Sequence, residues 1–396
     1  MSFQNPVFIP GPTNIPENLR KACDMPTIDH RSPLFGQILH PARAGVRKVL
    51  KSTSAEVFIF PSTGTGGWET ALTNTLSAGD TVLAARNGMF SQRWIDMCQR
   101  HGLNVNVVET PWGQGVPADR YAEILAADTG HQIKAVLATH NETATGVRSN
   151  IAAVRHALDA AGHPAMLFLD GVSSIGSMEF RFDDWGVDVA VTGSQKGFML
   201  PAGLGIVGFS AKAMEATKSA KLPRTFFDVH DMAKGYANNA YPYTPAVGLL
   251  NGLNTACGML LDEGLANVFA RHHRIAEGVR AAVGAWGLEL CAASPDLYSD
   301  TVSAIRTPEG FNATDIVTHA AEAYGVAFGV GLGEVADKVF RIGHLGSLTD
   351  VMMLSGIATA EMCMADLGLD ITLGSGVAAA QDYYRANRTV RQQDAA

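Results

Sequence analysis

The segment 187–197 constrains the fold of this chain more than any other. A short, largely β-branched run there is bounded by glycine and ends in a serine, a glutamine and Lys196. An earlier apolar run, 166–169, ends at Asp170. In an open α/β sheet the functional groups lie just past the carboxyl ends of the strands. We therefore expect the Lys196 amine and the Asp170 carboxylate at the same edge of one sheet.

An amine and a carboxylate in this arrangement are what pyridoxal phosphate (PLP) requires. The lysine forms a Schiff base with the cofactor, and the aspartate keeps the ring nitrogen protonated. Each residue alone has an ordinary explanation, because a lysine at a strand end is usually a solvated charge and an aspartate there is usually a turn former. Together with a phosphate-binding loop, Lys196 and Asp170 predict a PLP site.

That loop is the glycine-rich segment 62–69, between a predicted strand at 57–60 and a predicted helix at 68–76. Glycines there let backbone N–H groups approach an anion, and the helix N-terminus adds a favourable dipole. Thr65 can add a hydroxyl group. The segment is not a P-loop, because no lysine follows the glycines, and it lacks the spacing of a dinucleotide fingerprint. A loose glycine turn is the alternative.

Three further residues fit the same site. Phe90 follows the predicted strand 81–84 and offers an aromatic face to a planar ring, with core packing as the alternative. Thr143 follows another strand, and its hydroxyl could reach the phenolic oxygen of the cofactor or form a turn. Arg341 is a lone cation in a short apolar strand, so it binds either a substrate carboxylate, as guanidinium groups do bidentately, or an internal salt-bridge partner.

Composition narrows the class of protein. The chain has 396 residues, which predicts two domains, and with 47% apolar residues and 41 glycines it is typical of a glycine-rich α/β enzyme. A net charge of −8 and the lack of a basic run argue against nucleic acid as a partner. The five cysteines are scattered and never form a C-x-x-C pair, which predicts free thiols and no zinc or other metal site.

The same features predict a location. The N-terminus lacks a cationic region followed by an apolar core, so we expect no secretory signal. No apolar run is long enough to span a bilayer, so we expect no membrane partner. We expect the protein in the cytoplasm.

Helical and strand patterns alternate along the chain, which predicts a mainly parallel sheet with helices on both faces. The predicted strands are 57–60, 81–84, 105–108, 135–138, 166–169, 188–192 and 205–208. A long helical region at 245–286 leads to a second unit with strands at 301–306 and 339–342 and helices at 312–324, 350–366 and 374–389. We therefore predict an N-terminal arm at 1–20, a large cofactor-binding domain at 21–270 and a small C-terminal α/β domain at 271–396.

The chain resembles the class V, fold-type I PLP aminotransferases, within the group of serine–glyoxylate, aspartate–glyoxylate and alanine–glyoxylate enzymes. The likeness runs nearly end to end. The segments that carry it are 10–12, 29–32, 64–67, 140–146, 170–172, 194–196, 241–245 and 341–343. The resemblance implies a seven-stranded, mainly parallel sheet in the large domain.

The resemblance also implies roles for the cofactor-site residues. Lys196 would bond to PLP, Asp170 would pair with its ring nitrogen, and Val172 would pack on one face of the ring. Phosphate would be bound by Thr65, Gly66, Gly67 and Gln195, and the phenolic oxygen by Thr143. Some relatives carry a tryptophan where Phe90 stands and a histidine where Gly67 stands, so Gly67 can bind phosphate only through its backbone.

Two further sets of residues follow from the resemblance. Tyr241 and Thr244 would reach the phosphate of a neighbouring subunit, which implies a homodimer with shared active sites. Arg341 would hold the substrate α-carboxylate, in a substrate site that also includes Gly11. An aspartate donor would need a second cation for its β-carboxylate, and His30, Arg31 and His344 are the candidates.

The implied activity is transfer of an amino group from L-aspartate or L-serine to glyoxylate, by ping-pong kinetics through pyridoxamine phosphate. Alanine as donor is the alternative, as is another fold-type I reaction, a lyase or a cysteine desulfurase. A desulfurase needs a nucleophilic cysteine on a loop of the second domain, and there is none between Cys291 and Cys363.

Two weaker alternatives remain. The glycine run 329–333 could indicate a dinucleotide-binding regulator, but it lacks a preceding parallel-strand unit and a distal acidic residue in register. His272 and His273 could indicate a metal, but adjacent residues point to different faces of a helix.

Overall fold

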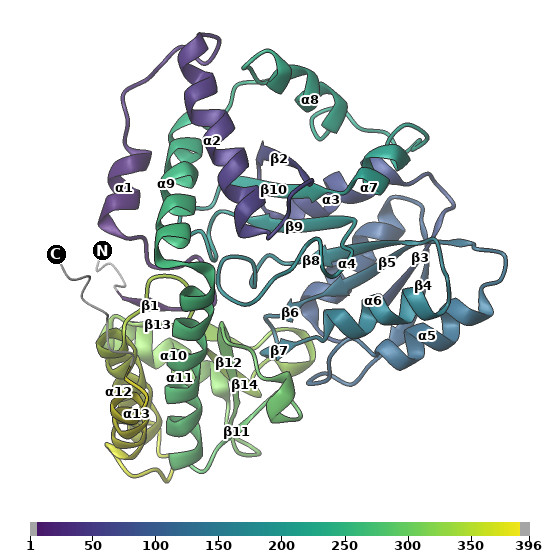
Figure 1. Cartoon of the computed structure of the whole chain (residues 1–396). Helices are drawn as coiled ribbons and strands as arrows, with labels where there is room; N and C mark the ends of the chain where they lie inside the picture. Colours follow the sequence, from purple (N-terminus) through teal and green to yellow (C-terminus); the bar gives the residue numbers. More distant parts are fainter. Residues whose placement is uncertain (1–5, 389–396) are drawn as a thin grey trace.

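The computed structural model describes residues 6–388. Residues 1–5 of the predicted arm, and the last residue of the helix predicted at 374–389, lie outside the described residues. Figure 1 shows a large unit built around one sheet and a smaller unit that holds the C-terminal part of the chain.

The large unit contains a seven-stranded sheet. Strand β10 is antiparallel to both of its neighbours, whereas the other pairs are parallel. In spatial order the strands are β2 (Glu56–Pro61), β10 (Leu204–Phe209), β9 (Val189–Gly193), β8 (Met166–Asp170), β5 (Ile133–Thr139), β3 (Thr81–Arg86) and β4 (Asn104–Glu109). The predicted α/β fold with a mainly parallel large sheet is confirmed.

Burial along the strands accounts for their order. Strands β8, β9 and β10 are buried at every residue, as expected for strands covered on both faces. Strand β4 is partly exposed along its whole length and forms one edge of the sheet. The adjacent central strands β8 and β9 therefore place Asp170 and the segment after Gly193 side by side in the interior.

Helices flank this sheet (Figure 1): α3 packs on β9 and β10, α4 on β3 and β4, and α2 along α9. Their bounds are α1 (Glu17–Cys23), α2 (Pro33–Val49), α3 (Gly64–Thr75), α4 (Met89–Arg100), α5 (Ala118–Ala127), α6 (Ile151–Ala160), α7 (Ala211–Ala216), α8 (Val229–Ala237) and α9 (Val247–Glu263). A two-stranded hairpin, β6 (Asn141–Glu142) and β7 (Val147–Arg148), follows β5.

The helical region predicted at 245–286 is two helices, α9 and α10 (Leu265–Ala285). Gly264 separates them with a φ of 82°. That conformation lies outside the right-handed helix and is open to glycine at little cost. The predicted helical region is therefore present, with a break at this residue that was not predicted.

The small unit is built on a second sheet, covered by helices. The sheet has the order β1 (Val7–Phe8), β13 (Ala327–Val330), β14 (Val339–Gly343), β12 (Val302–Arg306) and β11 (Glu289–Leu290). The remaining elements are α11 (Ala313–Tyr324), α12 (Asp350–Asp366), α13 (Ser375–Ala386) and the short 3-10 helices Pro295–Leu297 and Gly333–Val335. Among the described helices, none combines the length and the apolar character that crossing a membrane requires.

Two apolar cores correspond to the two units. One contains buried side chains from Leu19 to Val268, and the other combines Phe8 with side chains from Ile275 to Tyr384. The change from one core to the other falls within α10, which is compatible with the predicted boundary near residue 270.

The N-terminal arm connects both units. Strand β1 pairs in parallel with β13, and Phe8 is fully buried in the small-unit core. Further along, the backbone N–H of Thr13 donates to the carbonyl of Gln195 at 3.2 Å. The arm therefore passes directly beside Lys196.

Candidate active site

The first turn of α3 offers backbone donors to an anion. Its N-cap residue, Thr63, makes no side-chain capping bond, and Gly67 is the first residue of the helix whose N–H donates within it, to Thr63 O at 3.1 Å. An added Cβ on Gly66 would lie 2.0 Å from Ser62 Oγ. Thr65 is exposed. The chain thus keeps this helix start open and free of bulk, as a phosphate site requires.

Gln195 lies next to the same helix start. An ideal Cβ on Gly193 would be 2.8 Å from Gln195 Oε1 and 3.4 Å from the backbone N of Gly64. Gln195 Oε1 is buried without a protein partner. The structure therefore brings together Thr65, Gly66 and Gln195. The N–H of Gly67 is already engaged in the helix, so its part in phosphate binding stays a prediction.

The Lys196 side chain is enclosed by the arm. Its Nζ donates to the carbonyl of Pro10, and an added Cβ on Gly11 would lie 2.5 Å from Lys196 Cδ. Gly11 has a φ of 97°, which disfavours any other residue. Burial, and to a lesser extent the charge of Arg341, lower the pKa of the Lys196 ammonium group to about 8.

Asp170 ends β8 and is 4% exposed. Its carboxylate accepts the backbone N–H of Val172 at 2.9 Å. Burial raises the pKa of Asp170 to about 7, and the nearby Glu142 carboxylate acts in the same direction. Val172 contacts the start of α3, because an added Cβ on Gly64 would lie 2.5 Å from Val172 Cγ2. Asp170 and the phosphate-binding loop are thus parts of one site.

The hairpin segment after β5 supplies a third wall. Thr143 Oγ1 lies 2.7 Å from Ser173 Oγ, and both hydroxyls are buried. Glu142, to which sequence reasoning assigned no role, is fully buried and accepts the backbone N–H of Phe90 at 3.0 Å. The available signal was a single acidic residue, three positions after the end of buried strand β5 and between an asparagine and a threonine.

Arg341 joins the site from the small unit. Its Nε donates to Val330 O at 2.8 Å and its Nη1 to Thr143 O at 3.0 Å. Burial lowers the pKa of Arg341 to about 10, with Glu142 opposing that change. Within residues 6–388 Arg341 forms no ion pair, which argues against the internal salt bridge and leaves Nη2 available to a substrate carboxylate.

Four predicted residues lie elsewhere in this single chain. His30 and Arg31 belong to the segment between α1 and α2, and none of their hydrogen bonds reaches Lys196, Asp170 or Arg341. The Tyr241 hydroxyl donates to Ile59 O at 2.6 Å inside the large unit, and Thr244 is exposed. Their roles toward a neighbouring subunit or a substrate side chain stay predictions.

His272, His273 and His344, which were considered from sequence, all make hydrogen bonds within the chain. His344 is fully buried, with its ring nitrogens near Asp300 O and Ser303 Oγ, and burial lowers its pKa to about 3. His272 is buried, whereas the neighbouring His273 contacts the Asp300 carboxylate on another face of α10. In the described part of the chain no cluster of potential ligands could hold a metal ion.

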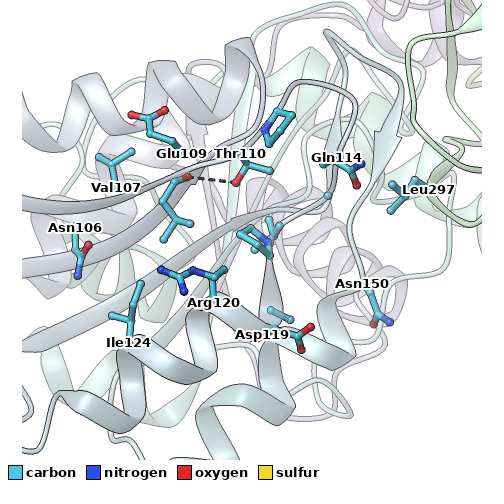
Figure 2. Close-up of a pocket in the computed structure, with 16 residues that line it drawn as sticks. Asn106, Val107, Glu109, Thr110, Gln114, Asp119, Arg120, Ile124, Asn150 and Leu297 are labelled. Atoms are coloured by element: carbon cyan, nitrogen blue, oxygen red, sulfur yellow. Dashed lines mark hydrogen bonds between the residues drawn. The ribbon is translucent and has the colours of Figure 1, made fainter.

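A separate cavity of about 740 Å³ lies at the outer edge of the large sheet (Figure 2). It is lined by β4 and the start of α5, including Glu109, Asp119 and Arg120. None of the residues that surround Lys196 contributes to it. This cavity is therefore distinct from the candidate active site.

Comparison with known proteins agrees with this geometry. The family model described as Aminotransferase class-V matches residues 21–339. The chain belongs to the class V aminotransferases. The chain is 76% identical to an L-aspartate–glyoxylate aminotransferase of Paracoccus denitrificans (strain Pd 1222), and the match covers the full length of both chains. It is 54% identical to a serine–glyoxylate aminotransferase of Hyphomicrobium methylovorum, covering 97% of this chain and 95% of the relative.

A solved structure extends the likeness to three dimensions. The pyridoxamine–pyruvate aminotransferase from Mesorhizobium loti superimposes with a TM-score of 0.91 at 28% identity, over 97% of this chain and 98% of that one. The cofactor of this class of aminotransferases is pyridoxal phosphate. The residues of this chain fit it: the free N–H groups at the start of α3 suit a phosphate, Asp170 suits a ring nitrogen, and Lys196 suits the aldehyde.

Proposed function

We propose that this aminotransferase moves the amino group of L-aspartate to glyoxylate, with formation of glycine and oxaloacetate. L-Serine is the second candidate donor. The observation that carries transamination is the placement of the Lys196 amine in one buried site with Asp170 and Arg341. Support for aspartate over serine comes from the higher identity to the aspartate–glyoxylate relative, 76% against 54%.

Asp170 and Lys196 have different roles in the proposed reaction. Bound PLP supplies an aldehyde that takes up the amino group and a ring that accepts electron density. The Asp170 carboxylate holds the ring nitrogen protonated. Burial lowers the pKa of the Lys196 ammonium group to about 8, so this amine is more readily neutral than that of an ordinary lysine. With the cofactor bound, Lys196 would be the group that moves a proton between the substrate α-carbon and the cofactor.

Arg341 orients the substrate for this transfer. The α C–H bond must stand roughly perpendicular to the cofactor ring, and a guanidinium group that grips the α-carboxylate fixes that angle. Because Nε and Nη1 are anchored to Val330 and Thr143, the guanidinium plane is held before substrate arrives.

A cysteine desulfurase is disfavoured by the state of the thiols. Cys291 and Cys363 are 2% and 0% exposed. Burial raises the pKa of both thiols, that of Cys363 to about 12. A desulfurase nucleophile must be an accessible thiolate. All five cysteines are free, which supports a reducing, cytoplasmic location as part of this proposal.

A homodimer with shared active sites is also part of the proposal. Large apolar side chains are exposed at one end of the large unit: Leu34 is 55% exposed, and Phe226 and Tyr243, each 38% exposed, stack with ring centroids 5.0 Å apart. Tyr243 directly precedes Thr244. A second copy seated there would cover these side chains and approach Thr244.

Mixing two variants tests the shared site. If Thr244 acts on the partner's cofactor, Thr244→Ala mixed with inactive Lys196→Ala regains activity, because one of the two sites in each mixed dimer is intact. No gain on mixing, with dimers present by sedimentation, would place Thr244 in its own subunit's site.

A donor panel tests the proposed activity. The purified enzyme is assayed with glyoxylate and L-aspartate, L-serine or L-alanine, and glycine formation is measured. We expect aspartate to give the highest kcat/KM, and Lys196→Ala to give no turnover with any donor while it remains folded. A higher kcat/KM with serine or alanine would show that the proposed donor is wrong. Accumulation of a lyase product without an acceptor would show that the proposed reaction class is wrong.

A further inference from the structure

We infer that Glu142 is a positioning residue that fixes Phe90 at the cofactor ring and ties Arg341 to the same wall of the site. This inference rests on the PLP site, because it concerns the residues that line it. No role for Glu142 follows from the family likeness used above.

The contacts of Glu142 connect two elements. Oε2 accepts the backbone N–H groups of Phe90 and Ser91, each at 3.0 Å, and Oε1 accepts that of Ala144 at 3.0 Å. Phe90 and Ser91 form the first turn of α4, whereas Ala144 follows the hairpin strand β6. The carboxylate therefore holds the start of α4 against the segment that carries Thr143.

The local structure leaves the first turn of α4 dependent on this carboxylate. Ser91 Oγ accepts the N–H groups of Asn87 and Gly88, at 3.1 and 3.0 Å, but reaches no further along the helix. Without Glu142 the N–H groups of Phe90 and Ser91 would face a buried region with no acceptor. An added Cβ on Gly88 would lie 2.2 Å from Glu142 Cγ, so the backbone closes tightly over this side chain.

The hydrogen bonds of Glu142 favour its ionised form. Its protein hydrogen-bond partners are all N–H donors, which fits an ionised carboxylate with no group to accept its proton. Burial raises the pKa of Glu142, and the donated N–H groups and the Arg341 charge oppose that rise. The next residue, Thr143, accepts a hydrogen bond from Arg341, so charge and backbone act on the guanidinium together.

The test replaces Glu142 by glutamine, which keeps the shape but turns one acceptor into a donor that faces N–H groups. We expect Glu142→Gln to weaken PLP binding by the apoenzyme about 10- to 100-fold, the range for charge-assisted hydrogen bonds. The induced circular dichroism of the bound cofactor should change as well, because the aromatic neighbour moves. The KM for amino donors should rise through Arg341.

A double-mutant cycle separates positioning from general loss of stability. If Glu142 acts through Phe90, Glu142→Gln in a Phe90→Leu background should weaken PLP binding much less than it does alone. Glu361→Gln is the matched control. Glu361 is 2% exposed and accepts the N–H groups of Gly374 and Gly376 at the start of α13 in the small unit. The Glu361→Gln substitution should lower Tm without changing the PLP affinity or the circular dichroism of the bound cofactor.

Several outcomes would overturn the inference. Equal losses of PLP affinity in both backgrounds would remove the link to Phe90. A lower Tm with unchanged affinity, dichroism and KM, as for Glu361→Gln, would make Glu142 an ordinary structural carboxylate. Failure of the wild-type protein to bind PLP would instead contradict the cofactor site itself, so the two failures are distinguishable.

Discussion

At the scale of single residues, the site is a set of buried ionisable groups. Burial shifts the pKa of each group in the direction that favours its neutral form. Burial lowers the pKa of Lys196 to about 8 and that of Arg341 to about 10, and raises that of Asp170 to about 7. A cofactor with a protonated ring nitrogen, and a substrate with a carboxylate, provide the missing opposite charges. Stability of the apoenzyme should therefore depend on pH through these groups.

The first residue-scale prediction concerns Asp170. Its pKa is raised from 3.8 to about 7 in the folded chain, so the folded state binds this proton more tightly than the unfolded state. The resulting stability is present below pH about 4 and is lost as the pH rises to about 7. Asp170→Asn removes this loss. As the pH rises between those values, we expect the Tm of the apo variant to increase relative to that of the apo wild type. The turnover of the variant should nevertheless fall severely.

Calorimetry of both apoproteins across that pH range checks the prediction. Lys196 titrates at higher pH, and the pH dependence from buried histidines such as His344 is common to both proteins and cancels in the difference. A constant difference in Tm between the two proteins would mean that Asp170 is not perturbed as described.

The second concerns Arg341. Lysine keeps the charge but loses the planar group that is anchored at Val330 and Thr143. We expect Arg341→Lys to lower kcat/KM by about one to two decades, for every amino acid and keto acid, in both half-reactions. Steady-state kinetics over a donor and acceptor panel measures this. A loss confined to one donor would assign Arg341 to a side-chain carboxylate instead.

Sequence reasoning placed Lys196 and Asp170 together because strand ends of a parallel sheet share an edge, whereas Gln195 was assigned to the site by the family resemblance. It left Arg341 open between a substrate carboxylate and an internal salt bridge, and only the family resemblance favoured the substrate. Glu142 was not identified, because its role depends on the backbone of α4, to which no sequence pattern connects it. The roles of His30 toward a substrate carboxylate and of Thr244 toward a neighbouring subunit stay predictions, because the contacts within one chain express neither role.

At the scale of elements, the start of α3 is the part most sensitive to added bulk. Gly66→Ala would place Cβ 2.0 Å from Ser62 Oγ, so the phosphate-binding turn must shift. We expect weaker PLP binding by about tenfold or more, from loss of one or more charge-assisted N–H contacts. Equilibrium titration of the apoenzyme with PLP measures this.

Gly284→Ala is the control. Gly284 is exposed in α10, and an added Cβ there meets nothing within 4 Å. Alanine should stabilise that helix by about 0.5–1 kcal/mol and leave PLP affinity unchanged. Equal PLP affinity of Gly66→Ala and wild type would show that the turn does not hold the phosphate.

Most large-sheet strands were predictable because they are nearly continuous apolar runs bounded by turns. The elements that were missed are short or depend on distant partners. Strand β13 overlaps the glycine run at 329–333 and is completed by β1 from the arm, a pairing with no local signal. The break at Gly264 was missed because apolar periodicity continues through it.

At the scale of the whole molecule, the arm couples the small-unit core to the active site. Phe8 is fully buried against side chains such as Phe328, with ring centroids 6.1 Å apart. Only a few residues later, Pro10 and Gly11 enclose Lys196. The position of Gly11 over Lys196 is therefore set by packing in the small unit. A substitution that disturbs this packing should also change the kinetics of the reaction.

Phe8→Ala tests this coupling. Removal of the ring should cost about 3–5 kcal/mol of stability, the usual range for a buried phenylalanine. It should also raise the KM for amino donors and lower kcat at temperatures where the protein is folded, because Gly11 is no longer held beside Lys196.

The comparison is Met364→Ala. Met364 is fully buried in the same core, near the C-terminal end of α12. It should cost about 2–5 kcal/mol. Steady-state kinetics well below both Tm values should then separate the two variants, with Met364→Ala close to wild type. Equal kinetic effects in both would mean that the small unit acts on the site through overall stability and not through the arm.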